Sequence, residues 1–296
     1  MTRFEEYNSS EYHALNVVFQ DTDLDKYIAM NIERLIYGCI EEKHCKYKTR
    51  FGVKYGEYNK WYPNGQLCLH CTYNIEGNLS GEYKRYSPEG QLLEHCFYKD
   101  GKIDGEYNKW HFNGGIKEQC FYKDGAIQGD YNMWYEPGQR WGRGGPQLIS
   151  RLHHHCTYKD GKIQGERKTW HSNGKLQLNE VFVDGKLNGL YELWNENGSR
   201  RLIWNYIDGV KEGEQKTFHQ DSQLESYEVY KNGVKHGEYK RWYSNGQVSA
   251  MGSYNNGVED GEYKMWSRDG YLSQHWMYKD GNIIEEYVKT KYGYIL

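Results

Sequence analysis

Cysteine and histidine side chains are the residues of this 296-residue chain best suited to metal or redox chemistry. Cys68 and Cys71 flank His70 in a Cys-x-x-Cys pair, with Cys39 and Cys45 nearby, a residue set typical of zinc sites. Side chains alternate between the two faces of a strand, so Cys68 and Cys71, three residues apart, would point in opposite directions. The spacing therefore favours ordinary strand cysteines, and no metal or cofactor is expected.

Four cysteines recur at one place in the sequence repeat described below, namely Cys71, Cys96, Cys120 and Cys156. If that place lies on alternate strands of one sheet, neighbouring α-carbons are about 10 Å apart, because strands are spaced at about 4.8 Å. A disulfide needs α-carbons closer than about 7 Å. We therefore expect four small, buried, apolar side chains.

The run His153-His154-His155 lies on a predicted strand, where only the first and third histidines share a face. His70 and His95 occupy the repeat position of His155, so a column of polar histidines is expected. Metal capture or pH sensing by that column is an alternative to a purely structural role.

No set of nucleophile, base and acid stands apart from the repeat background, and no glycine-rich loop joins a strand to a helix as phosphate binding requires. The sequence indicates a protein that is not an enzyme and has no small-molecule substrate.

Composition describes the kind of protein that would carry these residues. The formal charge of −3 argues against nucleic acid and gives no support to a membrane-lipid partner. Seven cysteines, no apolar run of membrane-spanning length and no signal-peptide pattern predict a cytoplasmic protein that is not secreted. Thirty tyrosines and ten tryptophans suit a thin β-structure that buries aromatic rings and leaves polar tips wet.

An internal repeat determines the predicted architecture. Nine segments begin with a glycine, and the dominant spacing is 24 residues. These glycines are Gly56, Gly81, Gly105, Gly129, Gly165, Gly189, Gly213, Gly237 and Gly261. Counting each as position 1, position 6 is aromatic, position 12 is aliphatic with the exception of Arg200, and position 18 is Tyr or Phe.

Two turn signals punctuate each repeat. Asn-Gly or Asp-Gly occurs at positions 9 and 10 in most repeats, as in Asn64-Gly65, and Asp-Gly or Asn-Gly recurs at positions 20 and 21, as in Asp100-Gly101. Both dipeptides predict two-residue type I′ hairpins, and the fold class is therefore all-β, an elongated antiparallel meander of hairpins. Position a would pair with 19 − a within a repeat. Pairing with the next repeat would then slip by two residues, which a bulge at the position-1 glycine could relieve.

The same pairing sorts the side chains between two faces. Positions 3, 12 and 18 are expected on the packed face, and position 6 on the other face with Glu at position 2 and Lys or Asn at position 4. The position-6 rings are a candidate interaction surface, because Trp dominates binding hot spots; the alternative is that the rings stack on one another and stiffen the sheet. The tryptophans concerned are Trp61, Trp110, Trp134, Trp170, Trp194, Trp242 and Trp266.

The motifs Gly-Glu-Tyr-x-x-Trp, Asn-Gly-Gln-Leu and Tyr-Lys-Asp-Gly-Lys resemble the MORN repeat. The resemblance is strongest to the variant of bacterial antitoxin-like proteins of the YwqK type, which is also expanded in large DNA viruses of protists. It covers roughly residues 41–296. It implies an all-β repeat sheet in which glycines and aromatics are structural, with no catalytic residues of its own.

The remaining segments are predicted to differ from the repeats. Residues 1–40 are expected to form a helical cap over the first strand edge, or a helix that docks a partner. Residues 41–296 are expected to form the repeat domain. A 12-residue insertion near residues 139–150 should leave the ladder as a functional loop or an inert hairpin, and its Arg140, Trp141 and Arg143 join the candidate surface.

These observations predict a non-catalytic scaffold for protein–protein interaction or self-association. Two alternatives stay open: a structural component of a larger assembly such as a virus particle, and, by family analogy alone, an antitoxin-like or membrane-lipid adaptor. A viral protein of this kind would lie in the host cytoplasm or in the particle.

Overall fold

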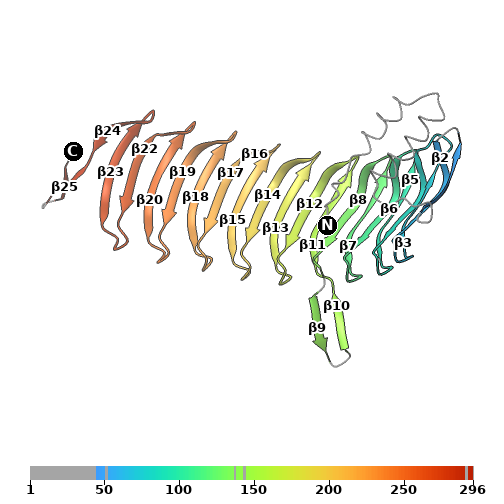
Figure 1. Ribbon diagram of the computed structural model, residues 1–296. Coiled ribbons are helices and arrows are strands. Elements are labelled where there is room, and N and C mark those ends of the chain that lie inside the picture. Colours follow the sequence, from blue (N-terminus) through green and yellow to red (C-terminus); the bar gives the residue numbers. More distant parts are fainter. Residues whose placement is uncertain (1–44, 51–52, 137, 143–144, 291–292, 296) are drawn as a thin grey trace, which may run out of the picture. The chain divides into compact units, whose positions relative to one another are not determined.

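The computed structural model describes residues 45–50, 53–136, 138–142, 145–290 and 293–295. These residues form an all-β structure, as predicted, and no helix occurs among them (Figure 1). The predicted helical cap at residues 1–40 lies outside the described residues. The chain divides into two compact units, Met1–Gly105 and Glu106–Leu296, and the division falls within strand β6 (Lys102–Trp110).

Each unit is an antiparallel meander in which consecutive strands pair. The first unit contains β1 (Cys45–Arg50), β2 (Val53–Trp61), β3 (Leu67–Tyr73), β4 (Leu79–Tyr86) and β5 (Leu92–Lys99).

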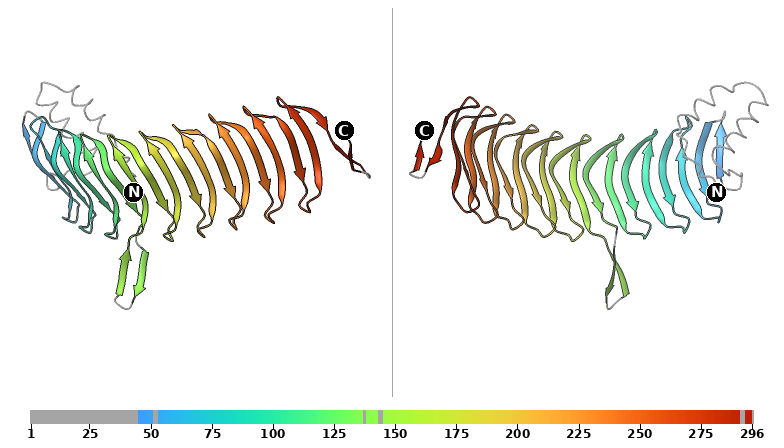
Figure 2. Two further views of the ribbon diagram at one scale, coloured as in Figure 1. Left: turned by 180° about the vertical axis from the view of Figure 1, so that it is seen from behind. Right: turned by 60° about the vertical axis from the view of Figure 1, so that its left-hand side comes forward.

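The second unit continues the same pattern through many more hairpins (Figure 2). Its strands are β7 (Ile116–Lys123), β8 (Ala126–Trp134), β9 (Gly138–Gly142), β10 (Gly145–Ile149), β11 (Leu152–Lys159), β12 (Lys162–Trp170), β13 (Leu176–Val183), β14 (Lys186–Trp194), β15 (Arg200–Ile207), β16 (Val210–Lys211), β17 (Gly213–Phe218), β18 (Leu224–Lys231), β19 (Val234–Trp242), β20 (Val248–Asn255), β21 (Val258–Glu259), β22 (Gly261–Trp266), β23 (Leu272–Lys279), β24 (Asn282–Glu286), β25 (Val288–Thr290) and β26 (Gly293–Ile295).

The insertion leaves the ladder, as predicted. β8 pairs directly with β11, and the intervening β9 and β10 pair only with each other. Arg140 and Trp141 belong to β9, whereas Arg143 lies outside the described residues.

The two turn signals produce two different turns. At positions 20 and 21 both residues have positive φ, +48° at Asp100 and +82° at Gly101, which confirms the predicted type I′ turn. At positions 9 and 10 only the glycine has a positive φ, as Gly65 does with φ +85°. Gly65 N–H donates to Tyr62 O at 2.9 Å, so this is a three-residue loop ending in a glycine bulge, and the prediction of a type I′ turn was wrong there.

The asparagine at position 9 has a different physical role from the one predicted. Its side-chain oxygen accepts the backbone N–H of position 11, as Asn64 Oδ1 does from Gln66 at 3.0 Å and Asn173 Oδ1 from Lys175 at 2.9 Å. The side chain thus closes the turn by mimicking a backbone acceptor, and positive φ is left to the glycine that follows.

Two irregularities per repeat set the register. Within a repeat, positions 1 to 5 pair with 18 to 14 as predicted, but position 6 then pairs with 12, as Trp61 does with Leu67. Between repeats, two extra residues around the position-1 glycine absorb the predicted two-residue slip. Cys71 consequently pairs with Tyr58 on one side and with Tyr83 on the other, and Glu180 likewise pairs with residues at position 3 on both sides, Arg167 and Tyr191. Equal positions therefore form straight rows across the strands.

Positions 3, 14, 16 and 18 form the packed face. Cys71, Cys96, Cys120 and Cys156 are at most 5% exposed, which confirms the expected burial of the position-16 cysteines. Tyrosines at positions 3 and 18 contact each other edge to face, as Tyr239 and Tyr254 do at 5.8 Å between ring centroids. Position 12 was wrongly assigned to this face, because its pairing with position 6 places it beside the tryptophans.

Hydrogen bonds tie successive hairpins together at the turn end. The N–H of the position-21 glycine donates to the carbonyl of position 23 in the preceding hairpin, as Gly209 N does to Leu187 O at 2.7 Å and Gly257 N to Lys235 O at 2.8 Å. Each turn is thus fixed on its predecessor.

The part of the chain that the structure describes contains no helical segment that could span a membrane.

Candidate interaction face

The face opposite the packed one consists of three rows. Position 6 pairs with 12 in the outer row, position 4 pairs with 15 in the middle row, and positions 2 and 17 form the third. We call this surface, made of positions 2, 4, 6, 12, 15 and 17 of the repeats, the polar face.

The predicted tryptophans form the outer row of the polar face. Each pairs with a position-12 side chain in the repeats where both strands are described in full, as Trp170 with Leu176, Trp242 with Val248 and Trp266 with Leu272. All seven rings are partly exposed. Among the described residues no ring contact joins one position-6 ring to the next, so each ring presents its own surface rather than a continuous stack. Arg140 and Trp141 lie in the separate β9–β10 hairpin and not in this row.

Position 7 holds the backbone of this row in place, a role that the sequence did not reveal. Its side chain donates to the carbonyl of the position-6 residue in the next repeat. Tyr135 and Tyr243 do so through their hydroxyls, both at 2.8 Å, to Trp170 O and Trp266 O. The same bond recurs from Tyr62 at 2.9 Å, from His111 at 3.2 Å, and from His171 and His219 at 3.0 Å each.

Because a carbonyl only accepts, each of these three histidines must carry a proton on Nε2. A recurring bond of this kind fixes the spacing of successive tryptophans. The rings of the row therefore project from a backbone of regular spacing.

Ion pairs occupy positions 2 and 4 in five of the nine repeats. Lys84 Nζ lies 2.7 Å from Glu82 Oε1, Lys216 Nζ lies 2.6 Å from Glu214 Oε2, and Lys168–Glu166, Lys240–Glu238 and Lys264–Glu262 repeat the arrangement. The hydrogen bond from Lys84 lowers the pKa of the Glu82 carboxyl, and Lys216 lowers that of Glu214. Such exposed pairs add little stability, so their main effect is to neutralise the acids of the polar face.

Position-15 histidines are held by polar partners in the same face. His95 Nε2 lies 3.0 Å from Glu82 Oε1, and His70 Nδ1 lies 2.7 Å from Asn59 Oδ1. No group of three or more His, Cys, Asp or Glu side chains suited to a metal ion occurs among the described residues.

The three consecutive histidines separate into different surroundings. His155 Nδ1 contacts Asn132 Oδ1 at 2.8 Å, whereas the His153 ring packs 4.5 Å from the ring of Tyr135. His154 lies on the packed face, where burial lowers its pKa to about 4. The histidines are thus part of hydrogen-bonded and packed surroundings rather than a shared ligand set.

Burial also makes the position-16 thiols less acidic. It raises the pKa of the Cys120 thiol to about 12 and that of Cys71 and Cys156 in the same direction. A thiol that stays protonated is a poor nucleophile, so these cysteines behave as small packing residues.

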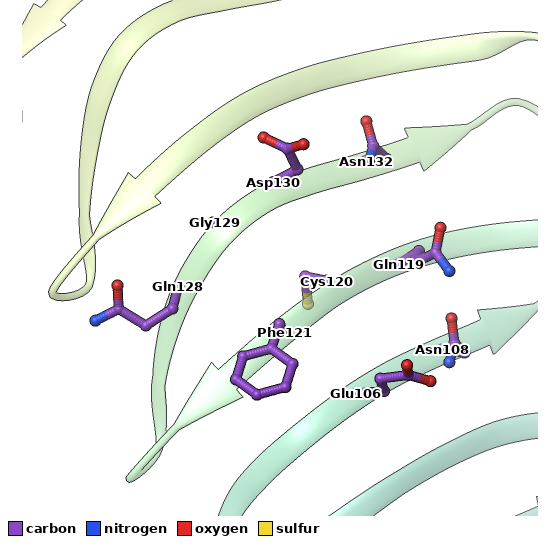
Figure 3. A pocket seen from close by; sticks show the side chains of 9 residues that line it. All are labelled: Glu106, Asn108, Gln119, Cys120, Phe121, Gln128, Gly129, Asp130 and Asn132. Carbon is purple, nitrogen blue, oxygen red and sulfur yellow. The ribbon is translucent and has the colours of Figure 1, made fainter.

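Four repeats lack the ion pair of the polar face: the Gly189 repeat has Leu190 and Glu192 at positions 2 and 4, and the Gly56 repeat has Glu57 and Asn59. The other two are consecutive. The Gly105 and Gly129 repeats carry Glu106 and Asp130 at position 2, but asparagine replaces lysine at position 4. These side chains, together with Gln119 and Phe121 of β7, line an open depression of about 590 Å³ (Figure 3). We call it the acid–amide depression. Sequence reasoning noted Lys or Asn at position 4 but did not notice that the asparagines fall on neighbouring repeats.

Comparison with protein families connects this architecture to known repeats. Six segments match the model of the MORN repeat variant, at residues 54–74, 79–100, 103–124, 163–184, 211–232 and 235–256. Three further hairpins, which begin at Gly129, Gly189 and Gly261, have the same pairing of positions 1 and 18 or of 6 and 12 without a match. Structure therefore shows repeats that the family model does not reach.

No curated protein matches this chain, and solved structures resemble it only weakly. Among solved structures, the crystal structure of TcdB2-TccC3-Cdc42 is 8% identical with a TM-score of 0.18, over 81% of this chain and 15% of that chain. The crystal structure of TcdB2-TccC3 is 10% identical with a TM-score of 0.19, over 80% of this chain and 18% of that chain. This chain spans less than a fifth of each, and similarity at these TM-scores identifies neither a fold nor a function.

Proposed function

Because this chain belongs to the MORN repeat variant family, we propose that it is a non-catalytic scaffold that binds a protein partner through its polar face. MORN repeats are hairpins whose glycines and aromatics maintain the sheet. Function in such a protein is carried by the exposed side chains that the repeats place in rows.

The observation that carries this proposal is the fixed row of partly exposed tryptophans. Position-7 side chains hold the backbone of the row, and the rings do not contact one another in the described residues. A tryptophan side chain has only two rotatable χ angles and loses little conformational freedom on binding, and Trp is enriched among hot spots of protein interfaces. Lysine–glutamate pairs beside the row supply the polar surroundings common at an interface rim.

The chain itself suggests the substitution that tests this proposal. Phe218 and Tyr86 occupy position 6 in two repeats, so a smaller ring is compatible with the fold. Trp194→Phe and Trp242→Phe should therefore remove indole surface while the hairpins remain intact. Tyr239→Phe, on the packed face and 7% exposed, is the matched control.

Affinity capture from the native source, quantified by mass spectrometry, measures the effect. We expect the doubly substituted chain to retain its thermal unfolding midpoint and to lose about tenfold of one stoichiometric partner, about 1.4 kcal/mol of binding. Tyr239→Phe should retain the partner. Equal capture by all three proteins would refute a role of the tryptophan row, and capture of the chain by itself alone would replace the partner with a second copy.

A further inference from the structure

The acid–amide depression differs in its charge from the five repeats of the polar face that carry an ion pair. Five repeats neutralise the position-2 acid with a position-4 lysine. No lysine or arginine lines the depression, although two carboxylates, Glu106 and Asp130, do. Asp130 accepts a hydrogen bond from the Thr157 hydroxyl at 3.0 Å, and Glu106 has no ion-pair partner among the described residues. The local surface is therefore left with uncompensated negative charge.

A buried amide faces the same depression. Asn108 lines it and is only 9% exposed, and its side chain makes no hydrogen bond with any residue of the described part of the chain. Its amide is therefore available to a ligand that enters the depression. Gln119 on the next strand likewise has no side-chain hydrogen bond to a described residue, while Asn132 Oδ1 is already engaged by His155.

An aromatic ring completes the set. Phe121 on β7 is 46% exposed and lies on the strand between those that carry Glu106 and Asp130 (Figure 3). Contacts across these strands, such as Tyr107 to Tyr122 at 5.5 Å and Lys109 Nζ to Glu118 Oε2 at 3.6 Å, show that β6 and β7 are adjacent. The depression thus offers an apolar ring, flanking carboxylates, and the amides of Asn108 and Gln119, which bond to no residue of the described part of the chain.

We propose that the acid–amide depression binds an arginine side chain of a basic protein segment. A guanidinium is planar and carries five N–H donors, so it can stack on the Phe121 ring while its edge donates to carboxylate and amide oxygens. Arginine also has no acceptor atom, which matches a site that presents two carboxylates without a neighbouring lysine. This assignment rests on the proposed scaffold function and specifies the chemistry of one partner contact.

A divalent cation fits the same residues poorly. Glu106 and Asp130 lie on strands separated by β7, which places their backbones about 10 Å apart at the usual strand spacing. Calcium gathers six to eight oxygens at about 2.3–2.6 Å, so both carboxylates cannot ligate one ion without a large rearrangement. They can, however, flank a side chain that lies on the ring between them.

The test uses the full chain and fluorescein-labelled hexa-arginine, with hexalysine of equal charge as the comparison probe. Fluorescence anisotropy at fixed ionic strength should show tighter binding of hexa-arginine than of hexalysine. The variant Glu106→Gln/Asp130→Asn should weaken hexa-arginine binding at least tenfold. The control Glu214→Gln/Glu238→Gln removes the same charge from lysine-paired acids and should change binding less than twofold.

Two further variants keep the acids. Asn108→Lys/Asn132→Lys restores the ion pairs found in five other repeats and should abolish the preference for arginine. Phe121→Thr removes the ring and should reduce that preference; threonine is compatible with the fold, because Thr72 and Thr157 occupy the same repeat position, position 17. Circular dichroism verifies that each variant is folded.

Equal weakening by the two acid variants would overturn the proposal, because binding would then follow net charge alone. Equal affinity for both peptides, or calcium chloride binding that competes with the peptide, would also overturn it. Failure here leaves the scaffold proposal intact if the tryptophan variants still lose the native partner. Conversely, a depression that binds hexa-arginine stands even if capture is insensitive to the tryptophans.

Discussion

Ser222 occupies position 10 of the turn in the Gly213 repeat, where a glycine stands in the equivalent turns of other repeats. Its φ is +70°, in the left-handed region where the other repeats place glycine, such as Gly174 at +85°. Ser222 N–H still donates to His219 O at 2.9 Å, so the turn has the same closure as its neighbours. The hairpin therefore carries conformational strain that Ser222→Gly should relieve.

The magnitude follows from two opposing terms. A non-glycine residue in the left-handed region costs about 1–2 kcal/mol. Glycine loses more backbone entropy on folding, about 0.5–1 kcal/mol. No described residue accepts or donates a bond with the Ser222 side chain, so nothing else is lost. We expect Ser222→Gly to raise the free energy of unfolding by about 0.5–1 kcal/mol.

The matched variant is Gly174→Ser, which should lower the free energy of unfolding by a similar amount. A Cβ at Gly174 would meet no atom within 4 Å, so its cost is conformational rather than steric. Urea unfolding followed by tryptophan fluorescence gives the global value, and amide hydrogen exchange in the altered hairpin gives the local one, because repeat arrays open locally. A destabilised Ser222→Gly, or an unaffected Gly174→Ser, would refute this account of the turn.

Three further perturbations probe the packed face. Gly252→Ala should destabilise by about 1–3 kcal/mol in urea unfolding, because its Cβ would lie 2.5 Å from the Tyr263 ring; an unchanged midpoint would show that the ring moves freely. Arg167→Tyr should cost about 3 kcal/mol, because it leaves the 3%-exposed Glu180 without its ion-pair partner, whereas Arg167→Tyr/Glu180→Cys restores the Tyr–Cys pair of other repeats and should recover most of the loss. Burial keeps His154 neutral by lowering its pKa to about 4, so stability present above pH 6.5 should fall as the pH drops toward 4. His154→Gln should flatten that limb of the stability profile, and an unchanged slope would assign it to other groups.

Much of the fold was predictable because it depends on local chemistry. Asp-Gly at positions 20 and 21 requires positive φ at both residues, and the structure has it at Asp100 and Gly101. The 24-residue period then fixed the pairing of positions 1 to 5, and the position-1 glycine was correctly expected to bulge. Strand alternation was enough to place the tryptophans on the face of positions 2 and 4.

The second turn was not predictable from its dipeptide. Asn-Gly suits both a two-residue loop and a three-residue loop with a bulge, and the choice depends on whether position 6 pairs with 13 or with 12. The pairing of position 6 depends on the register of the neighbouring strands, which the dipeptide does not encode. Because position 6 pairs with position 12, Leu67 and its equivalents lie beside the tryptophans and not on the packed face that was predicted for them.

The acid–amide depression was missed for a related reason. In the sequence, the depression is marked only by asparagine instead of lysine at position 4, at Asn108 and Asn132. This difference points to a site only when equal positions of neighbouring repeats are known to lie side by side in one row. The hydrogen bonds from position-7 side chains could not be predicted for the same reason. The Tyr135 hydroxyl, for example, donates to a carbonyl 35 residues away in the sequence, and the two come together only through the row arrangement.

The straight rows allow the binding specificity of the polar face to change without disturbing the packed face. A position-16 side chain such as Cys71 lies between two position-3 side chains, Tyr58 and Tyr83, so a change there disturbs two neighbours at once. A change at position 4 of the polar face meets only the exposed side chains around it, and exposed ion pairs contribute little stability. Replacing lysine by asparagine in two adjacent repeats therefore alters the recognition chemistry of one site while the register and the packed rows remain the same.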